Sequence, residues 1–352
     1  MKKRVFLLTL AAAGMAAIAV ACGGDSSSKG TPAGGPQLSG QATSAPVTAG
    51  PNDVLALKKT PSTFAADDAA WKDAKATTVK TAQIKGSAST EGKDVKVQAL
   101  YSDTDVWFRF EWADANKTLV GNWTFDGTKW TNEAGQQDRL ALLFPITPIA
   151  DFQTKGCFAV CHNPAADPVK QWYMITPASG NLADLWQWTA KISNGMNEMN
   201  DGTLTSILTS PTALGSPIVA DPYTGGGSFN NRNADNSGPL FMQNTTIKPT
   251  MGSDYLVLQE AVLLDPKVIK AGDKVPNVVV APYQGDRGDI DAKGSWSNNT
   301  WTVIAHRKLD TGNADDVKLT VGGSFPFGLA AFNALGDVDH TVTETAYNLL
   351  LK

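Results

Sequence analysis

The sequence predicts a mainly β protein, a single β-sandwich with long inserted loops and a few short helices. Apolar and polar residues alternate along residues 95–101 and again along residues 106–112, and a four-residue polar turn joins the two runs. This pattern is typical of a β-hairpin. A second hairpin is predicted from residues 294–296 and 300–307, on either side of a polar turn. Strands near both ends of the folded region, without an internal repeat or a long amphipathic helix, favour one sandwich.

The remaining elements are predicted from shorter patterns. Short apolar runs predict further strands at residues 139–144, 255–261, 278–281 and 317–321. Short helices are predicted at residues 65–75 and 183–192. The stretch 210–250 contains three consecutive glycines and several asparagines, which predicts a long covering or functional loop.

Residues 1–21 have the order of a secretory signal peptide. Three basic residues at positions 2–4 precede an apolar run, which ends in small residues before Cys22. The segment Ala19-Val20-Ala21-Cys22 resembles a bacterial lipoprotein box, in which the cysteine is lipidated and becomes the mature N-terminus. An ordinary signal peptide followed by a chance cysteine is the alternative.

Residues 22–52 are predicted to form a flexible tether, because a tract rich in Gly, Pro, Ser and Thr cannot bury a core. We expect the folded domain over residues 53–352, outside the cytoplasm, in the periplasm or on the cell surface. The lipid on Cys22 would anchor it to the membrane. The chain has 30 basic and 34 acidic residues and a net charge of −4. This balance excludes a general nucleic-acid binder, which needs a basic excess.

The strongest chemical motif is Gly156-Cys157-Phe-Ala-Val-Cys161-His162, in a chain that has only 3 Cys and 3 His. Covalent haem proteins carry Cys-x-x-Cys-His, in which both sulfurs attach to the haem and the His ligates the iron. Here one more residue separates the two cysteines, but Cys161 still directly precedes His162. The motif therefore predicts one haem c bound through Cys157 and Cys161, with His162 as an iron ligand.

Three other interpretations of this motif compete with haem attachment. A disulfide between Cys157 and Cys161 is chemically reasonable in an oxidising compartment. A zinc site would need more strong ligands than two Cys and one His provide. A redox-active dithiol normally begins a helix after a strand in a thioredoxin-like unit, and the sequence lacks that context.

Several stretches, in order along the chain, resemble the haem-binding gamma-subunit family of ethylbenzene dehydrogenase and related molybdoenzymes of the DMSO-reductase type. These stretches are residues 106–114, 138–145, 156–162, 183–188, 294–296 with 301–303, 307–312 and 323–330. The resemblance implies a β-sandwich that holds one haem near its edge and passes electrons without transforming a substrate. Some members hold a haem b by Met and Lys. This chain resembles the members with a Cys-x-x-x-Cys-His segment, which implies a covalent haem.

The resemblance also implies a second iron ligand. Met174 lies shortly before the pair Trp186 and Trp188, where the non-covalent members place one ligand. A thioether sulfur is also a common partner of His in electron-transfer haems. The alternative is that Met174 fills space in the core. By the same analogy Lys267 or Lys270 could serve instead, although both have the pattern of surface lysines in a turn.

The other candidate ligands are expected at the surface. His306 lies on its predicted strand opposite the apolar positions, so we expect it at the rim. His340 lies in a polar loop, where it could ligate the iron or pair with a haem propionate, but we expect it on the surface. Asp286, Asp289 and Asp291 alternate but lack the twelve-residue calcium loop with its closing Glu. We therefore expect a solvated turn there.

Together these features predict a lipid-anchored monohaem c-type cytochrome, an electron-transfer protein without catalytic residues of its own. Its partner would be the catalytic or iron–sulfur subunit of a DMSO-reductase-type molybdenum oxidoreductase, or another redox protein of a respiratory chain. The alternative is an extracytoplasmic β-sandwich lipoprotein that binds carbohydrate or another ligand through aromatic side chains. In that case a Cys157–Cys161 disulfide would be structural.

Overall fold

A computed structural model of the chain describes residues 49–84, 91–119, 121–133, 135–160, 175–205, 218–248, 254–333 and 340–352. The predicted signal peptide and most of the predicted tether therefore lie outside the described residues. Val47–Lys352 form one compact unit. Within the described ranges, no helix is long and apolar enough to span a bilayer.

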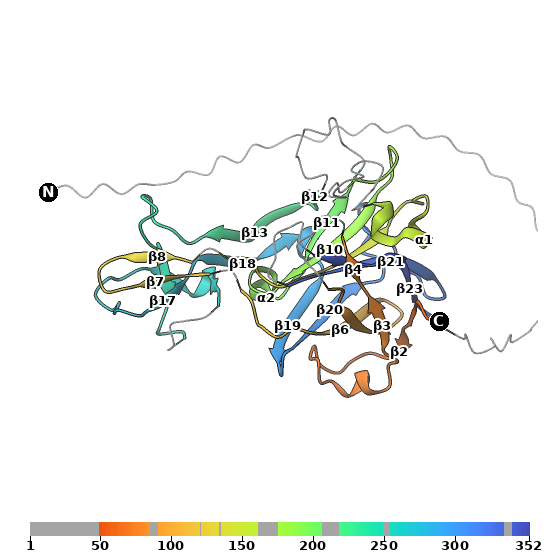
Figure 1. Cartoon of the computed structure of the whole chain (residues 1–352), viewed down its shortest axis with the longest axis horizontal. Coiled ribbons are helices and arrows are strands. Elements are labelled where there is room, and N and C mark those ends of the chain that lie inside the picture. The colour runs from red at the N-terminus through yellow and green to blue at the C-terminus, as the bar shows by residue number, and fades with distance from the viewer. Residues whose placement is uncertain are drawn as a thin grey trace, which may run out of the picture. The chain divides into compact units, whose positions relative to one another are not determined.

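Two large sheets form the centre of this unit (Figure 1). In the described residues the larger sheet has nine strands. Its main path runs in the order β1 (Asp53–Leu55), β23 (Tyr347–Leu350), β21 (Ser324–Phe332), β9 (Arg139–Pro145), β10 (Ala183–Thr189), β11 (Asn200–Leu204) and β12 (Ile218–Ala220). β22 (Thr341–Val342) pairs with β21, and β4 (Ala82–Gln83) pairs with β22.

The second sheet has six strands in the described part of the chain. Its order is β19 (Asp291–Ser297), β20 (Thr300–Lys308), β6 (Asp105–Ala113), β5 (Asp94–Tyr101) and β2 (Leu57–Lys58), and β3 (Thr77–Lys80) pairs with β5. Both predicted hairpins are confirmed, because β5 pairs antiparallel with β6 and β19 pairs antiparallel with β20.

Three smaller sheets complete the described strands. They contain β13 (Tyr223–Asn230), β18 (Val278–Gly285) and β15 (Leu256–Val257); β14 (Phe241–Gln243) and β16 (Ala261–Leu263); and β17 (Lys274–Pro276), β7 (Asn122–Phe125) and β8 (Trp130–Asn132). The helical segments are α1 (Phe152–Lys155), α2 (Ile192–Met196) and the 3-10 turns η1 (Ala69–Lys72), η2 (Gly156–Ala159), η3 (Leu258–Glu260) and η4 (Asp286–Gly288).

The main core lies between the two large sheets. Alternate residues of β9 and β10 on one side, and of β6 and β20 on the other, belong to one cluster of buried side chains. Each large side chain buried there contributes about 1.5–3 kcal/mol to folding. At its centre the rings of Trp188 and Trp301 meet at 5.1 Å and 71°. Gly294 leaves room for them, since a Cβ there would lie 2.2 Å from the Trp188 ring.

A second apolar cluster covers the other face of the larger sheet. The alternate residues of β9 and β10 that point away from the main core, such as Leu143 and Leu185, pack there against α1 and η2. The larger sheet is thus buried on both faces where these two strands run. The predicted fold class, a mainly β sandwich with a few short helices, is confirmed.

Burial on both faces explains the one large error in the predicted elements. The helix expected at residues 183–192 is in fact strand β10 followed by α2. Trp186 and Trp188 face the main core, while Ala183 and Leu185 face the second cluster. Apolar residues on both faces hide the period of two that marks a half-exposed strand.

The other differences are local. The helix expected at 65–75 is only the single turn η1, capped by the Asp68 carboxylate. The strand expected at 317–321 is absent from this described segment, where the Val317 amide donates to the Asp184 side chain. Residues 255–261 form two short strands separated by η3. In the described part of 210–250, β12, β13 and β14 replace the expected loop, and the glycines at 225–227 produce irregular register in β13.

Candidate functional site

Of the residues predicted to attach or ligate haem, the structure describes Cys157, Lys267 and Lys270. Cys157 lies in η2 with 3% of its surface exposed. Its amide donates to the carbonyl of Thr343 at 3.3 Å, and its Sγ lies 3.7 Å from Thr343 Oγ1. These contacts fix the first cysteine of the motif against Thr343, the residue that directly follows β22.

Two glycines allow η2 to approach the sheet this closely. Gly156 has a φ of +50°, and a Cβ there would lie 2.8 Å from the Thr345 carbonyl carbon. Gly328 faces the cysteine from β21, where a Cβ would lie 2.6 Å from Cys157 Sγ. The space that a side chain would fill at Gly328 is therefore taken by the sulfur.

The surroundings of Cys157 are apolar. The second cluster brings it together with residues of β9, β10, β21 and α1: Ala141, Leu143, Phe152, Ala183, Leu185 and Ala330. Phe332 packs against the same cluster, and the ring of His340 stacks on Phe332 at 4.2 Å. His340 is only 6% exposed, so its expected surface position was wrong. This histidine lies at the border of the cluster that holds Cys157.

The other predicted ligands are not brought to this cluster. Lys267 and Lys270 are exposed in the segment between β16 and β17. His306 lies at the rim, as expected, 26% exposed and stacked on Trp107 at 5.0 Å. Cys22, Cys161, His162 and Met174 lie outside the described residues.

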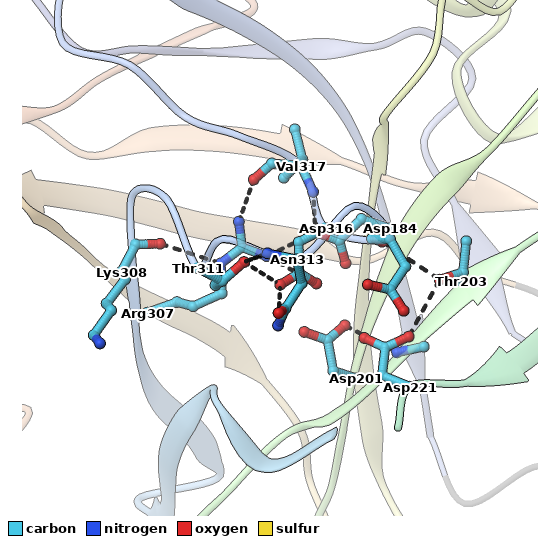
Figure 2. Close-up of polar contacts among 12 residues, drawn as sticks. Asp184, Asp201, Thr203, Asp221, Arg307, Lys308, Thr311, Asn313, Asp316 and Val317 are labelled. Atoms are coloured by element: carbon cyan, nitrogen blue, oxygen red, sulfur yellow. Dashed lines mark hydrogen bonds and ion pairs between the residues drawn. The ribbon is translucent and has the colours of Figure 1, made fainter. Parts of the chain in front are cut away.

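A second group of polar side chains lies where Arg307 of the six-stranded sheet pairs with Asp184 of the larger sheet (Figure 2). Asp184 on β10 and Asp201 on β11 point to the same side as Trp186, which is the register partner of Asp201. Arg307 comes from β20 of the facing sheet, two residues beyond the core residue Ala305. We call Asp184, Asp201, Asp221, Asp289, Asp316 and Arg307 the carboxylate cluster.

Arg307 is the centre of this cluster. Its Nη1 donates to Asp184 Oδ2 at 2.7 Å and lies 3.7 Å from Asp316 Oδ1, while its Nη2 donates to the carbonyl of Val317. The guanidinium also lies 4.6 Å over the ring of Trp186. Stacking and hydrogen bonds together hold the cation in one orientation.

The carboxylates outnumber this cation, and burial disfavours their charged forms. Burial, and then the neighbouring carboxylates, raise the pKa of Asp201 well above its ordinary value. The same causes raise the pKa of Asp221 and of Asp289 to about 7. Burial lowers the pKa of Arg307, but the surrounding carboxylates outweigh it and leave that pKa raised.

The comparisons with known proteins identify the family. A family model described as ethylbenzene dehydrogenase matches residues 68–347, which is most of the chain and includes the Cys157–His162 motif. The chain belongs to the ethylbenzene dehydrogenase family. The family is that of the gamma subunit, a haem-binding subunit of an oxidoreductase complex, and it associates with molybdoenzyme subunits. No curated protein matches the chain.

The solved structures similar to this member of the ethylbenzene dehydrogenase family include a family 9 carbohydrate-binding module from Caldicellulosiruptor kristjanssonii. Its complex with cellotriose has 11% sequence identity and a TM-score of 0.32, and the match covers 85% of this chain and 93% of that chain. The complex of the module with glucose has the same identity and TM-score and is covered to 95%.

In this ethylbenzene dehydrogenase family member, sequence reasoning missed the carboxylate cluster. One signal was present: Arg307 continues the alternation of Trp301, Val303 and Ala305, which all face the core. Asp289 was expected in a solvated turn, but both of its carboxylate oxygens are buried. That expectation was wrong because η4 folds back beside β11 rather than into solvent.

Proposed function

We propose that this chain is a monohaem c-type electron-transfer subunit, bound to the membrane through a lipid on Cys22, outside the cytoplasm. Its partner would be the catalytic or iron–sulfur subunit of a DMSO-reductase-type molybdenum oxidoreductase. The observation that carries the proposal is the family match over residues 68–347, together with the Cys157–Cys161–His162 motif inside it.

The residues around Cys157 fit a haem attached beside them. Cys157 belongs to a cluster of aliphatic and aromatic side chains on the larger sheet, the kind of surface that packs against a porphyrin and keeps water away from it. Gly328 leaves the sulfur its place, since a Cβ there would collide with it. Cys157 and Cys161 would hold the haem, and His162 and Met174 would ligate its iron.

When bound, the haem supplies one-electron transfer between Fe(III) and Fe(II). The chain's own contribution is to fix the attachment segment through the hydrogen bond from the Cys157 amide to Thr343 and to exclude water through the second apolar cluster. Both contributions tune the potential of a haem, through its ligands and its burial.

Expression of the full chain with a cytochrome c maturation system tests the proposal. We expect a red protein that keeps its haem on a denaturing gel. Cys161→Ala and His162→Ala should lose most of the stain or change the spectrum. Cys22→Ser is the matched control, because it should keep the haem while the protein moves from the membrane to the soluble fraction.

Two results would contradict parts of this proposal. A colourless protein with an intact Cys157–Cys161 disulfide would overturn electron transfer and leave the binding-module alternative. A haem protein that stays soluble with Cys22 intact would overturn the lipid anchor only.

A further inference from the structure

We infer that Asp184, Asp201 and Asp316 bind a calcium ion between the two large sheets. One carboxylate oxygen from each of the three lies within 4.8 Å of the others. Two oxygens bound to the same Ca²⁺ at 2.3–2.6 Å are at most about 5 Å apart, so one ion can reach all three.

The hydrogen bonds of these carboxylates leave one oxygen of each side chain for a ligand. Asp184 Oδ1, Asp201 Oδ2 and Asp316 Oδ1 are buried and have no hydrogen-bond partner, although Asp316 Oδ1 lies 3.7 Å from Arg307 Nη1 in an ion pair. Asp184 and Asp201 are themselves fully buried. Buried polar atoms are almost always hydrogen-bonded, so one buried oxygen without a hydrogen bond on each of three clustered carboxylates needs a cause.

The second oxygen of each carboxylate is held by the protein. Asp184 Oδ2 accepts from Arg307 and from the Val317 amide, and Asp201 Oδ1 accepts from the Gly202 amide at 2.9 Å. Asp316 Oδ2 accepts from Thr311 Oγ1 and Asn313 Nδ2. Figure 2 shows these contacts around the three side chains. Such outer contacts orient the ligands of a metal site.

The charge of the cluster favours a divalent cation. Arg307 forms ion pairs with Asp184 and Asp316, and Asp221 and Asp289 add further carboxylates nearby. A bound cation would offset this excess of carboxylates over positive charge. The donors are all carboxylate oxygens, with no nitrogen or sulfur, and this set selects a hard ion such as Ca²⁺ over zinc or copper.

This inference does not rest on the proposed haem, because Asp184 faces the main core while the neighbours Ala183 and Leu185 face the cluster of Cys157. Its failure would leave the electron-transfer proposal untouched. The competing account of the same geometry is that the carboxylates share protons and bind no metal.

Calcium binding by the full chain, purified and then freed of metal with EGTA, tests the inference. Titration calorimetry with CaCl₂ should give one site per chain. Added Ca²⁺ should raise the melting temperature, and EGTA should reverse the rise, because a ligand that binds the folded state stabilises it. MgCl₂ should bind more weakly, since Mg²⁺ needs a tighter octahedron.

Asp201→Asn is the decisive variant. We expect its calcium affinity to fall at least about tenfold, because ligand charge sets affinity in such sites. Its calcium-free melting temperature should not fall below that of the wild type, because a neutral amide needs neither a proton nor a counter-charge to be buried beside the other carboxylates. Asp103→Asn is the control, since Asp103 is an exposed hairpin carboxylate paired with Lys58, and it should bind Ca²⁺ as the wild type does.

Two results would overturn the inference. One is a wild type that takes up no Ca²⁺ at millimolar concentration and melts identically in Ca²⁺ and EGTA. The other is an Asp201→Asn variant that binds Ca²⁺ with unchanged affinity.

Discussion

Arg307 and Asp184 form a fully buried ion pair that joins the two large sheets, with a distance of 2.7 Å from Nη1 to Oδ2. Asp184 lies on β10 of the larger sheet and Arg307 on β20 of the other. Asp184 also accepts a hydrogen bond from the Val317 amide at 2.9 Å, and Arg307 donates to the Val317 carbonyl. The pair thus fixes the segment after β20 as well as the two sheets.

Arg307→Met should therefore destabilise the protein by about 3–5 kcal/mol, because removing one partner of a buried pair leaves the other charge uncompensated. The free energy of unfolding, from urea titration in the presence of EGTA, measures the loss. Arg232→Met is the control: Arg232 is exposed, and its loss should change stability by no more than about 0.5 kcal/mol. A loss at Arg307 as small as that of the control would contradict a structural role for the pair.

The hairpins could be predicted from the sequence, whereas the carboxylate cluster could not, apart from the place of Arg307 in the alternation of β20. In β5 and β6 one face is more polar than the other, so the alternation is visible in the residue order. In β10 both faces are buried, and a charged residue, Asp184, stands on the inner face. The pattern around it gave no sign of a strand with a polar inner position.

The cluster also depends on contacts between distant parts of the chain. Asp184 and Asp201 meet through strand pairing, but Asp316 arrives from a loop after β20, and Arg307 from the opposite sheet. Local patterns cannot report such pairings. The Cys157 motif could be found because all its chemistry lies within six consecutive residues.

Gly328→Ala tests the close contact between β21 and η2. The new Cβ would lie 2.6 Å from Cys157 Sγ, and such overpacking costs about 1–3 kcal/mol. In a Cys157→Ala background the clash disappears, so the same substitution should cost at least about 1 kcal/mol less. Urea unfolding of the four proteins measures this coupling.

Gly50→Ala is the control for that cycle, because the nearest atom to its Cβ is the Asp53 side chain at 3.3 Å in an exposed turn. It should show no coupling to Cys157→Ala. Equal costs of Gly328→Ala in the two backgrounds would contradict the contact.

Lys191 offers a test of a buried cation. Its Nζ donates to Gly121 O, Asn122 Oδ1 and Asn277 Oδ1 at 2.9, 3.1 and 3.2 Å. Lys191→Met should destabilise the protein by about 1–3 kcal/mol, because these oxygens lose their donor. Lys293→Met, at an exposed lysine of β19, is the control and should cost no more than about 0.5 kcal/mol.

The pH dependence of the stability lost in Lys191→Met gives an independent check that Lys191 is a buried cation. Burial lowers the pKa of Lys191 from 10.5 to about 8. Between these values the unfolded chain binds more protons than the folded one, so Lys191 makes stability rise with pH. The stability of the wild type relative to Lys191→Met should therefore increase from pH 8 to 10.5. A constant difference over this range would show that the folded-state pKa is not lowered.

The contribution of His306 to stability should depend on pH in the opposite direction to that of Lys191. Burial lowers its pKa, but hydrogen bonds and charges from Asp291 and Asp105, each at 3.0 Å, outweigh burial and raise it above 6.5. This stabilisation is complete below the unfolded pKa and disappears as the pH rises through the folded pKa. Relative to His306→Gln, the wild type should be more stable by up to about 1 kcal/mol at acidic pH, and the difference should shrink toward alkaline pH. A difference that grows with pH would contradict the sign.

The second iron ligand can be decided by spectroscopy of the haem protein. Met174 lies outside the described residues, whereas His340 borders the apolar cluster of Cys157. If Met174 ligates the iron, the ferric protein shows the far-red band of Met-ligated haem. Met174→Ala should abolish this band and lower the potential, because the thioether raises it. His340→Ala should leave the band in place. A wild type without the band, whose low-spin spectrum turns high-spin in His340→Ala, would instead assign the ligand to His340.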